Sequence, residues 1–372
     1  MEMYFILKKD FTFISNDRME KTRKEQGWKL TDKYPFELET LEDEDALNRA
    51  LELSRESDVI IIGSAPEIYV KERMKNKSPG LTFRYSERIF KKGKWRFLSP
   101  RGLLGRAKTY YRYGNKKIYM LCASAYTSAD LMLQGAYLGK CYKWGYFPET
   151  ISYALKELML KKKQTKINIL WCGRFLKWKH PEAALWLASR LKEDGFEFNL
   201  KIIGAGELED KIKIIITRDK LEPYVKLLGT RSPKEVRGEM EKANIFLCTS
   251  DFNEGWGAVI NEAMNSGCAL VASHAVGAVP YLIQDGENGL IYKNADMNSL
   301  YKKTRLLFQE IGLCEKLGSC AYDTITREWN AKEATRRFFL LTNDLIEKGY
   351  SNRFRTGPCS KAEIIGNYWY KD

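Results

Sequence analysis

The sequence predicts an α/β protein of two domains, each built around a parallel β-sheet. Its 372 residues suit two domains of ordinary size, each able to bury its own hydrophobic core. Short, continuous apolar segments such as 58–63 and 167–171 are typical of strands that are covered on both faces. They are followed by polar or glycine-containing loops, and helical patterns recur between them. This alternation is typical of parallel strands joined by crossover helices.

The composition is that of a globular chain, with 44% apolar and 13% aromatic residues. The sequence has no run of 18 or more apolar residues and no signal-peptide pattern, which predicts a soluble cytoplasmic protein. The eight cysteines are scattered and form no C-x-x-C pair. We therefore interpret them as reduced thiols and expect neither a disulfide framework nor a zinc site.

The net charge of +14 indicates an anionic partner. Nucleic acid, phosphorylated substrates and anionic membranes are the three classes to consider. The sequence contains no ribonucleoprotein aromatic signature and no zinc-finger spacing, so we expect no nucleic-acid binding. A phosphorylated substrate and a membrane surface remain.

The start of the first half is less regular. The opening 1–15 lacks a clear strand feeding a polar loop, which leaves open whether the first strand of the domain precedes this chain. The segment 42–56 has acids in its first turn and leucines on one face, which predicts a helix. Asp43 and Asp45 formally match a metal-binding Asp-x-Asp. Because they begin a helix and do not follow an apolar strand, we interpret them as helix-start residues and expect no metal site.

Two loops of the first half follow predicted strands and carry polar side chains. Ser64 and Glu67 follow the strand at 58–63, and Ser86 and Glu87 lie at the end of the strand within 82–88. Open α/β sheets bind ligands at the carboxyl ends of their strands. These four residues are candidates for contact with a ligand, and an ordinary loop role explains them equally well.

The segment 88–117 is unusually basic. It holds eleven Lys or Arg, six aromatic residues and no Asp or Glu. Basic residues near an anionic bilayer contribute about 1 kcal/mol each, and aromatic residues prefer the interface. We expect this segment to dock on the cytoplasmic leaflet of an anionic membrane. The alternative is a solvated helix pair. The following 118–147 reads as strand, helix and short strand, which completes a first domain of 1–147 before a linker of 148–165.

The second half begins with the strand at 167–171 and a loop that carries Arg174 and Lys179. Pro181 then opens a helix. Arg offers a planar fork for phosphate oxygens and Lys a compact charge, so the pair suits a diphosphate. The segment 201–206 is a strand and tight loop that lacks the third glycine of a dinucleotide fingerprint. A further strand at 225–229 precedes Thr230 and Arg231.

The stretch 250–267, SDFNEGWGAVINEAMNSG, follows a short apolar strand and reads as a loop, a helix and a glycine stop. The amides of Gly255, Trp256 and Gly257 are free to face an anion at the helix N-terminus. Glu254 and Glu262 are eight residues apart, a little over two helical turns, so both carboxylates lie on one side of the element. An acid beside an anion site indicates a substrate that combines phosphate with hydroxyl groups.

This arrangement resembles the Glu-x7-Glu motif of the family-four retaining glycosyltransferases, which have the GT-B fold. The resemblance implies two facing Rossmann-like domains with a C-terminal helix crossing back. It implies that 166–325 binds the nucleotide-sugar and that 326–372 packs back on the N-terminal domain, with 324–340 as the terminal helix. The resemblance also implies which part of the donor single residues contact. Glu254 would contact the transferred sugar, and Glu262 the ribose. The diphosphate would be bound by Arg174, Lys179 and Gly255–Gly257, and the base by Thr230 and Arg231.

The chain departs from the family's pattern in one respect. The family's first domain often carries a His that touches the donor sugar, whereas both histidines here, His180 and His274, lie in the second half. We interpret His180 as a polar residue at a helix start. The acceptor-side chemistry is therefore unassigned. The candidates for contact with the sugar or the acceptor are Ser64, Glu67, Ser86 and Glu87. We expect a sugar or lipid-linked acceptor beside the membrane on which 88–117 docks.

The predicted function is transfer of a sugar from a nucleoside diphosphate, UDP favoured over GDP, to an acceptor hydroxyl with retention of configuration. Because Arg174 and Lys179 supply positive charge, we expect no metal and no cofactor. The expected pathway is assembly of a cell-surface polysaccharide or glycolipid. Two alternatives stay open: a GT-B epimerase or phosphorylase-like enzyme, and a catalytically degenerate, membrane-associated binding protein. Whether Glu254 acts as a nucleophile is also open.

Overall fold

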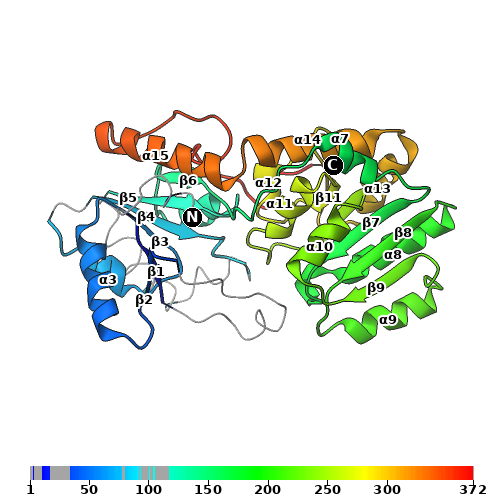
Figure 1. Ribbon diagram of the computed structural model, residues 1–372, viewed down its shortest axis with the longest axis horizontal. Coiled ribbons are helices and arrows are strands. Elements are labelled where there is room, and N and C mark those ends of the chain that lie inside the picture. Colours follow the sequence, from blue (N-terminus) through cyan, green and yellow to red (C-terminus); the bar gives the residue numbers. More distant parts are fainter. Residues whose placement is uncertain are drawn as a thin grey trace. The chain divides into compact units, whose positions relative to one another are not determined.

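The computed structural model describes Met3, 11–16, 34–77, 80–91, 93, 100, 104 and 117–371, and these residues form two compact units (Figure 1). The first unit contains the described residues up to Gly145 together with Ala331–Ile365, and the second contains Tyr146–Asn330 together with the residues from Gly366 onward. The terminal segment 326–372 is thus divided between the units. The chain passes between them three times, because its last residues return to the second unit.

The second unit is built on a six-stranded parallel sheet with the strand order β12-β11-β10-β7-β8-β9. Its strands are β7 Ile167–Cys172, β8 Phe198–Ile203, β9 Val225–Gly229, β10 Ile245–Cys248, β11 Ala269–Ser273 and β12 Leu290–Tyr292. From β7 the order runs outward through β8 and β9, and from β10 it runs the other way through β11 and β12. Adjacent β7 and β10 therefore flank the topological switch point, where open α/β sheets bind their ligands.

Helices cover both faces of this sheet because successive strand residues point to opposite sides. Ile169 and Trp171 belong to one core cluster, with residues of α8, α9 and α13, and Leu170 belongs to the other, with residues of α10, α11, α12 and α14. The helical elements are α7 Leu155–Lys161, η4 Lys177–Lys179, α8 Pro181–Glu193, α9 Glu209–Arg218, α10 Pro233–Met240, α11 Ala258–Asn265, α12 Val279–Leu282, α13 Met297–Gln309 and α14 Leu313–Arg327.

The first unit contains a four-stranded parallel sheet, β3-β4-β5-β6, and a separate parallel pair, β1-β2. Its elements are β1 Phe13–Ser15, β2 Glu37–Glu39, α3 Glu44–Glu56, β3 Val59–Ile62, α4 Ile68–Arg73, β4 Leu81–Ser86, β5 Ile118–Cys122, α6 Thr127–Met132, β6 Cys141–Lys143 and α15 Ala331–Glu347. Asp43 is the N-cap of α3, with its carboxylate accepting from Ala46 N at 2.8 Å. This is the structural role predicted for the Asp-x-Asp match.

The terminal helix differs from the sequence prediction. A single helix through 324–340 was expected, whereas α14 ends at Arg327 and α15 begins at Ala331. Between them Trp329 is buried in the second unit, with its ring 5.9 Å from that of Trp256. The helix that follows belongs to the first unit, where Phe338 packs 4.9 Å from Phe83. The helix is interrupted between α14 and α15 because Trp329 and Phe338 are buried in different units.

Most of the basic segment 88–117 lies outside the described residues, including 94–99 and 105–116, and the predicted membrane contact falls on them. The start of the segment is tied into the first unit, because the carboxylate of Asp130 accepts from Ile89 N at 2.9 Å and Phe90 N at 3.0 Å. None of the helices in the described part of the chain is long and apolar enough to cross a bilayer.

The loop after β8 packs directly against the loop after β7, and two glycines permit this. Gly204 has a φ of +139°, and a Cβ there would lie 1.9 Å from the carbonyl oxygen of Gly173. A Cβ at Gly206 would lie 2.9 Å from backbone atoms of Phe175. The loop that carries Arg174 and Lys179 therefore packs against the loop after β8 so closely that positions 204 and 206 require glycine.

Replacing Gly204 with Ala is expected to destabilise the second unit by about 3 kcal/mol, because backbone must move to admit the methyl group. The matched control is Gly238→Ala in α10, where a Cβ meets nothing within 4 Å. That change is expected to stabilise the unit by about 0.5–1 kcal/mol. Urea unfolding followed by tryptophan fluorescence measures both, and equal stability of the two variants would contradict this account of the loop.

Candidate functional site

Two loops at the carboxyl ends of β7 and β10 are joined by hydrogen bonds. Thr249, directly after β10, accepts from Trp171 Nε1 at 2.8 Å. Its hydroxyl lies 2.6 Å from the carbonyl oxygen of Lys179 and 3.0 Å from that of His180. Asp251 N also donates to the carbonyl oxygen of Trp178 at 3.0 Å. The loop that carries Lys179 is therefore fixed against the loop that carries Glu254.

Lys179 and Glu254, two of the predicted site residues, form an ion pair between Nζ and Oε2. Ser250 Oγ donates to the same carboxylate oxygen at 3.1 Å. Both side chains are largely shielded, with 17% of Lys179 and 12% of Glu254 exposed. The ammonium also lies 4.5 Å from the centre of the Trp178 ring. A cation and an acid that were assigned separate roles from the sequence are thus directly paired.

Glu262 projects from α11 and is partly buried. Burial raises the pKa of its carboxyl, and the positive charge of Arg237 opposes this. Within the described residues, no hydrogen-bond donor reaches the Glu262 carboxylate. Burial of the Cys172 thiol at the end of β7, and secondly the negative charge of Glu262, raise the pKa of this thiol to about 12. Burial and then the charge of Glu254 likewise raise the pKa of Cys248 at the end of β10. The two carboxylates therefore lie close to the ends of the two central strands.

The N-terminus of α11 supplies backbone donors beside Glu254. Gly257 precedes the helix with a φ of +90°, and a Cβ there would lie 2.8 Å from Val276 Cγ1, so the position requires glycine. The amides at 255–259 have no acceptor in the described part of the chain, as is usual at a helix start. Trp256 contributes only its backbone, because its side chain is fully buried and donates from Nε1 to Asn261 Oδ1 at 2.8 Å.

The other donor-side candidates lie on the same edge of the sheet but do not contact the pair of Lys179 and Glu254. Arg174 is exposed in the loop after β7, and no partner for its guanidinium is present among the residues that the structure describes. Thr230 and Arg231 are exposed in the loop after β9. They precede the capping box in which Ser232 and Glu235 begin α10. The structure shows no contact from these three residues to Glu254 or Glu262.

The acceptor-side candidates lie at the carboxyl ends of the adjacent strands β3 and β4 in the first unit. Ser64 is exposed. Glu67 pairs with Arg84 at 3.2 Å, and Ser86 Oγ donates to the carbonyl oxygen of Glu87 at 2.7 Å. Glu87 in turn pairs with Lys91. Both acids are therefore engaged by cations of their own unit.

The structure adds one cluster that sequence reasoning missed. His180, in the left-handed conformation between η4 and α8, places Nε2 3.3 Å from Asp251 and Nδ1 3.7 Å from Glu182. The hydrogen bonds to these two acids raise the pKa of His180 to about 9. Asp251 lies 71 residues away in the sequence. No local pattern marks the pair, because only the packing of the two loops creates it.

Protonated His180 is expected to stabilise the junction of these loops. Because its folded pKa is raised, the contribution is fully present below the ordinary value of 6.5 and is lost as pH rises through about 9. His180 is partly exposed, so solvent screens the pair, and we expect His180→Asn to lower the Tm by only about 1–3 °C at pH 6. Asn tolerates the left-handed backbone. The difference in Tm should shrink between pH 7 and 9.5; a difference that is constant with pH would contradict the assignment.

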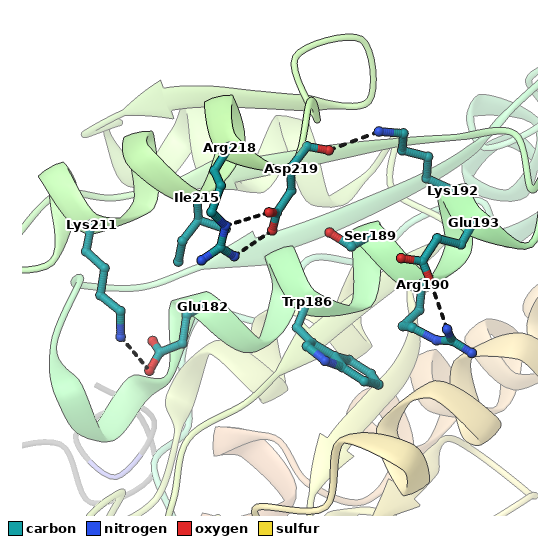
Figure 2. Close-up of a pocket in the computed structure, with 10 residues that line it drawn as sticks. All are labelled: Glu182, Trp186, Ser189, Arg190, Lys192, Glu193, Lys211, Ile215, Arg218 and Asp219. Carbon is teal, nitrogen blue, oxygen red and sulfur yellow. Dashed lines mark hydrogen bonds and ion pairs between the residues drawn. The ribbon is translucent and has the colours of Figure 1, made fainter.

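A hollow in the second unit lies between α8 and α9 (Figure 2). Its charged groups are engaged with one another. Lys211 lies 3.6 Å from Glu182, Arg218 pairs with Asp219, and Arg190 pairs with Glu193 at 2.7 Å. None of the residues proposed from the sequence lines this hollow. One lining residue, Glu182, also lies 3.7 Å from His180 in the loop after β7.

Comparison with known proteins bears on the same half of the chain. Residues 158–324 match the family model "Glycosyl transferases group 1". An uncharacterized glycosyltransferase of Methanocaldococcus jannaschii is 32% identical over 142 residues, which are 38% of this chain and 37% of that protein. The amylovoran biosynthesis glycosyltransferase AmsK of Erwinia amylovora is 29% identical over 163 residues, 42% of this chain and 39% of AmsK. The chain thus matches less than half the length of these relatives.

Solved structures that resemble this chain are GT-B glycosyltransferases, which confirms the predicted fold class. One of them is Anabaena Alr3699/HepE, solved in complex with UDP. It aligns with a TM-score of 0.61 at 15% identity, covering 80% of this chain and 82% of that one. Likeness at this level of identity concerns the fold alone.

Proposed function

We propose that this chain, whose residues 158–324 match the group 1 glycosyltransferase model, is a retaining glycosyltransferase that uses a nucleoside-diphosphate sugar. The observation that carries the proposal is the meeting of Lys179, Glu254 and the N-terminus of α11 at the switch point between β7 and β10. A cation and free amides suit a diphosphate, and an acid beside them suits the attached sugar.

The chemistry separates charge. Breaking the bond between the sugar and the diphosphate leaves positive charge on the sugar and negative charge on the leaving group. Lys179, Arg174 and the amides at 255–257 stabilise the diphosphate, and Glu254 orients the sugar and counters its positive charge. In the structure Lys179 is paired with Glu254. Donor binding exchanges this partner for a phosphate oxygen and frees the Glu254 carboxylate for the sugar.

The nucleoside is held by the remaining candidates. The Glu262 carboxylate is partly buried and suits the two ribose hydroxyls, which are donors that can replace the water it loses on burial. Thr230 and Arg231 lie after β9 and would contact the base. We favour UDP over GDP, since Anabaena Alr3699/HepE was solved with UDP. Side-chain cations supply the positive charge, so the proposed reaction needs neither a metal nor a cofactor.

The acceptor is proposed to be a sugar or lipid-linked sugar of a cell-surface polysaccharide or glycolipid, on the cytoplasmic face of the membrane. The support is the name of AmsK, an amylovoran biosynthesis enzyme, together with the basic and aromatic composition of 88–117. Flotation with anionic and with neutral liposomes tests the membrane contact. Enrichment with anionic lipid only is expected, and equal binding to both would overturn this part of the proposal.

A panel of nucleoside diphosphates and their sugars, scored by thermal shift and then by product analysis, tests the proposed function. We expect UDP to raise the Tm and one UDP-sugar to donate its sugar to an alcohol acceptor with retained configuration. Isomerisation or hydrolysis without an alcohol would favour the epimerase or phosphorylase-like alternative. Nucleotide binding with no turnover on any acceptor would favour a degenerate binding protein, and no binding would refute the proposal.

A further inference from the structure

Near its C-terminus the chain forms a strap on the second unit, defined here as Asn367–Tyr370. Trp369 and Tyr370 pack against the hydrophobic cluster that contains Trp256. The Tyr370 hydroxyl lies 2.6 Å from the carbonyl oxygen of Ile291 and 3.0 Å from Asp285 Oδ2. The strap lies outside 158–324, so the family match does not account for it.

His274, at the end of β11, connects the strap to the rest of the unit. Its side chain is 5% exposed. Asn294 N donates to Nδ1 at 2.8 Å, and Nε2 lies 3.1 Å from the carbonyl oxygen of Asn367. Since Nδ1 accepts, Nε2 carries the proton and donates it to the strap, which defines a neutral imidazole. The ring also stacks on Tyr370, with 5.8 Å between centroids.

The other side of the imidazole faces the turn that presents Glu254. Phe252 meets the His274 ring edge to face, with the centroids 5.4 Å apart. Phe252 lies inside the turn that is closed by Glu254 N donating to the carbonyl oxygen of Asp251 at 3.0 Å. The loop that begins at His274 makes a second contact, because Ala278 N donates to the carbonyl oxygen of Trp256 at 3.0 Å. A continuous set of contacts therefore runs from the strap through His274 to Glu254.

We propose that the strap and His274 are positioning elements for Glu254, acting through Phe252 on the turn that carries this acid. The effect on catalysis rests on the proposed function, whereas the contacts between the strap, His274 and the turn do not depend on it. With the strap seated, the imidazole is fixed by hydrogen bonds on both nitrogens, and Phe252 has a rigid surface to pack on. With the strap released, the turn of Asp251–Glu254 loses that support.

The same geometry makes the seating of His274 sensitive to acid, although the hydrogen bond from Nε2 to the strap is kept in both protonation states. An imidazolium carries a proton on both nitrogens, so it can no longer accept from Asn294 N. Burial lowers the pKa of His274, the hydrogen bonds to Asn367 and Tyr292 oppose this, and the nearby charge of Lys293 lowers the pKa as well. Among the residues that the structure describes, Asp285 and Lys303 also lie near this face and pair with each other at 2.8 Å beside Tyr370. The neutral imidazole therefore contributes stability above its ordinary pKa of 6.5, and this contribution is lost as pH falls through the lowered value.

The first test compares two residues of the strap. Trp369 packs on the core cluster, whereas the neighbouring Tyr368 is 93% exposed. Trp369→Ala is expected to speed hydrogen exchange in 367–370 and also at the amides of Asn253 and Glu254. With the UDP-sugar that the thermal-shift panel identifies as donor, it should lower kcat by about tenfold while the donor KM stays within a few-fold. Tyr368→Ala should change none of these. Tyr370→Phe, which removes only the hydroxyl bonds, serves if Trp369→Ala fails to fold.

The second test separates the two nitrogens of His274. A Gln at this position can still donate toward Asn367, and an Asn can still accept from Asn294. Both remove the titration. The loosening of His274 from Asn294 that we expect on the acid side in the wild type, measured as faster exchange at the Asn294 amide, should therefore be absent from both variants. His274→Gln should keep the strap better protected from exchange than His274→Asn.

Release of the strap in Trp369→Ala with unchanged exchange at Asn253 and Glu254 would overturn the proposal. Acid-side exchange at the Asn294 amide that rises in both His274 variants as in the wild type would also overturn it. If the wild-type protein transfers no sugar at all, the proposed function fails, and the exchange measurements still decide whether the strap supports the turn.

Discussion

Glu254→Gln is expected to abolish sugar transfer while UDP affinity stays within a few-fold of the wild type. The change keeps the shape of the side chain and removes its charge, so the positive charge that develops on the sugar is no longer countered. We expect kcat to fall by about 10²–10³, the range found when one electrostatic stabiliser is removed from an active site. UDP binding should survive because Lys179, released from its ion pair with Glu254, remains available to phosphate. Steady-state kinetics and calorimetric titration of UDP measure the two quantities.

Glu287→Gln is the matched control, since this acid is exposed in the same unit and lies outside the candidate site. It should leave kcat unchanged. Glu254→Ala should behave as Glu254→Gln, because both lose the charge. Unchanged turnover in either Glu254 variant would refute the role of this carboxylate.

Arg174→Ala is expected to raise the donor KM and to lower kcat together. The guanidinium would contact the diphosphate both in the bound donor and in the transition state, where the leaving group carries more negative charge. A charge-assisted hydrogen bond contributes roughly 1.5–3 kcal/mol, so kcat/KM should fall by about tenfold to a hundredfold. Initial rates over a range of donor concentrations give the separate changes in KM and kcat.

Lys177→Ala controls for the loss of positive charge from the same loop, because Lys177 is also exposed and is not a candidate. It should change kcat/KM by less than about twofold, since screening makes isolated surface charges weak. Arg174→Lys should recover part of the loss, as it restores charge without the planar fork. Full activity in Arg174→Ala, or equal losses in Arg174→Ala and Lys177→Ala, would contradict a specific contact with the diphosphate.

The strands of the second unit could be predicted because each is a short apolar run ended by a polar or glycine-containing loop. The predicted strand at 167–171 agrees with β7 Ile167–Cys172, and the run ending at Cys248 agrees with β10 Ile245–Cys248. Their adjacency in the sheet could not be read from these patterns. Every buried parallel strand carries a similar apolar run, whatever its neighbours are.

The contacts within the candidate site could be predicted only in part, for the same reason. The sequence singled out Lys179 and Glu254 but not their ion pair, which depends on Thr249 joining the two loops. The contact of His180 with Asp251 and the seating of the strap on His274 also bring together residues far apart in the chain. The prediction of one helix through 324–340 was wrong at Trp329, because burial of this side chain in the second unit overrides the helical pattern around it.

A crystal structure of the full chain with UDP tests the central claim most directly. The account predicts the β-phosphate within hydrogen-bonding distance of Lys179, Arg174 and the amides that begin α11, with Lys179 no longer paired to Glu254 and the ribose on Glu262. A diphosphate bound elsewhere, such as in the hollow between α8 and α9 (Figure 2), with the Lys179–Glu254 pair intact, would contradict it.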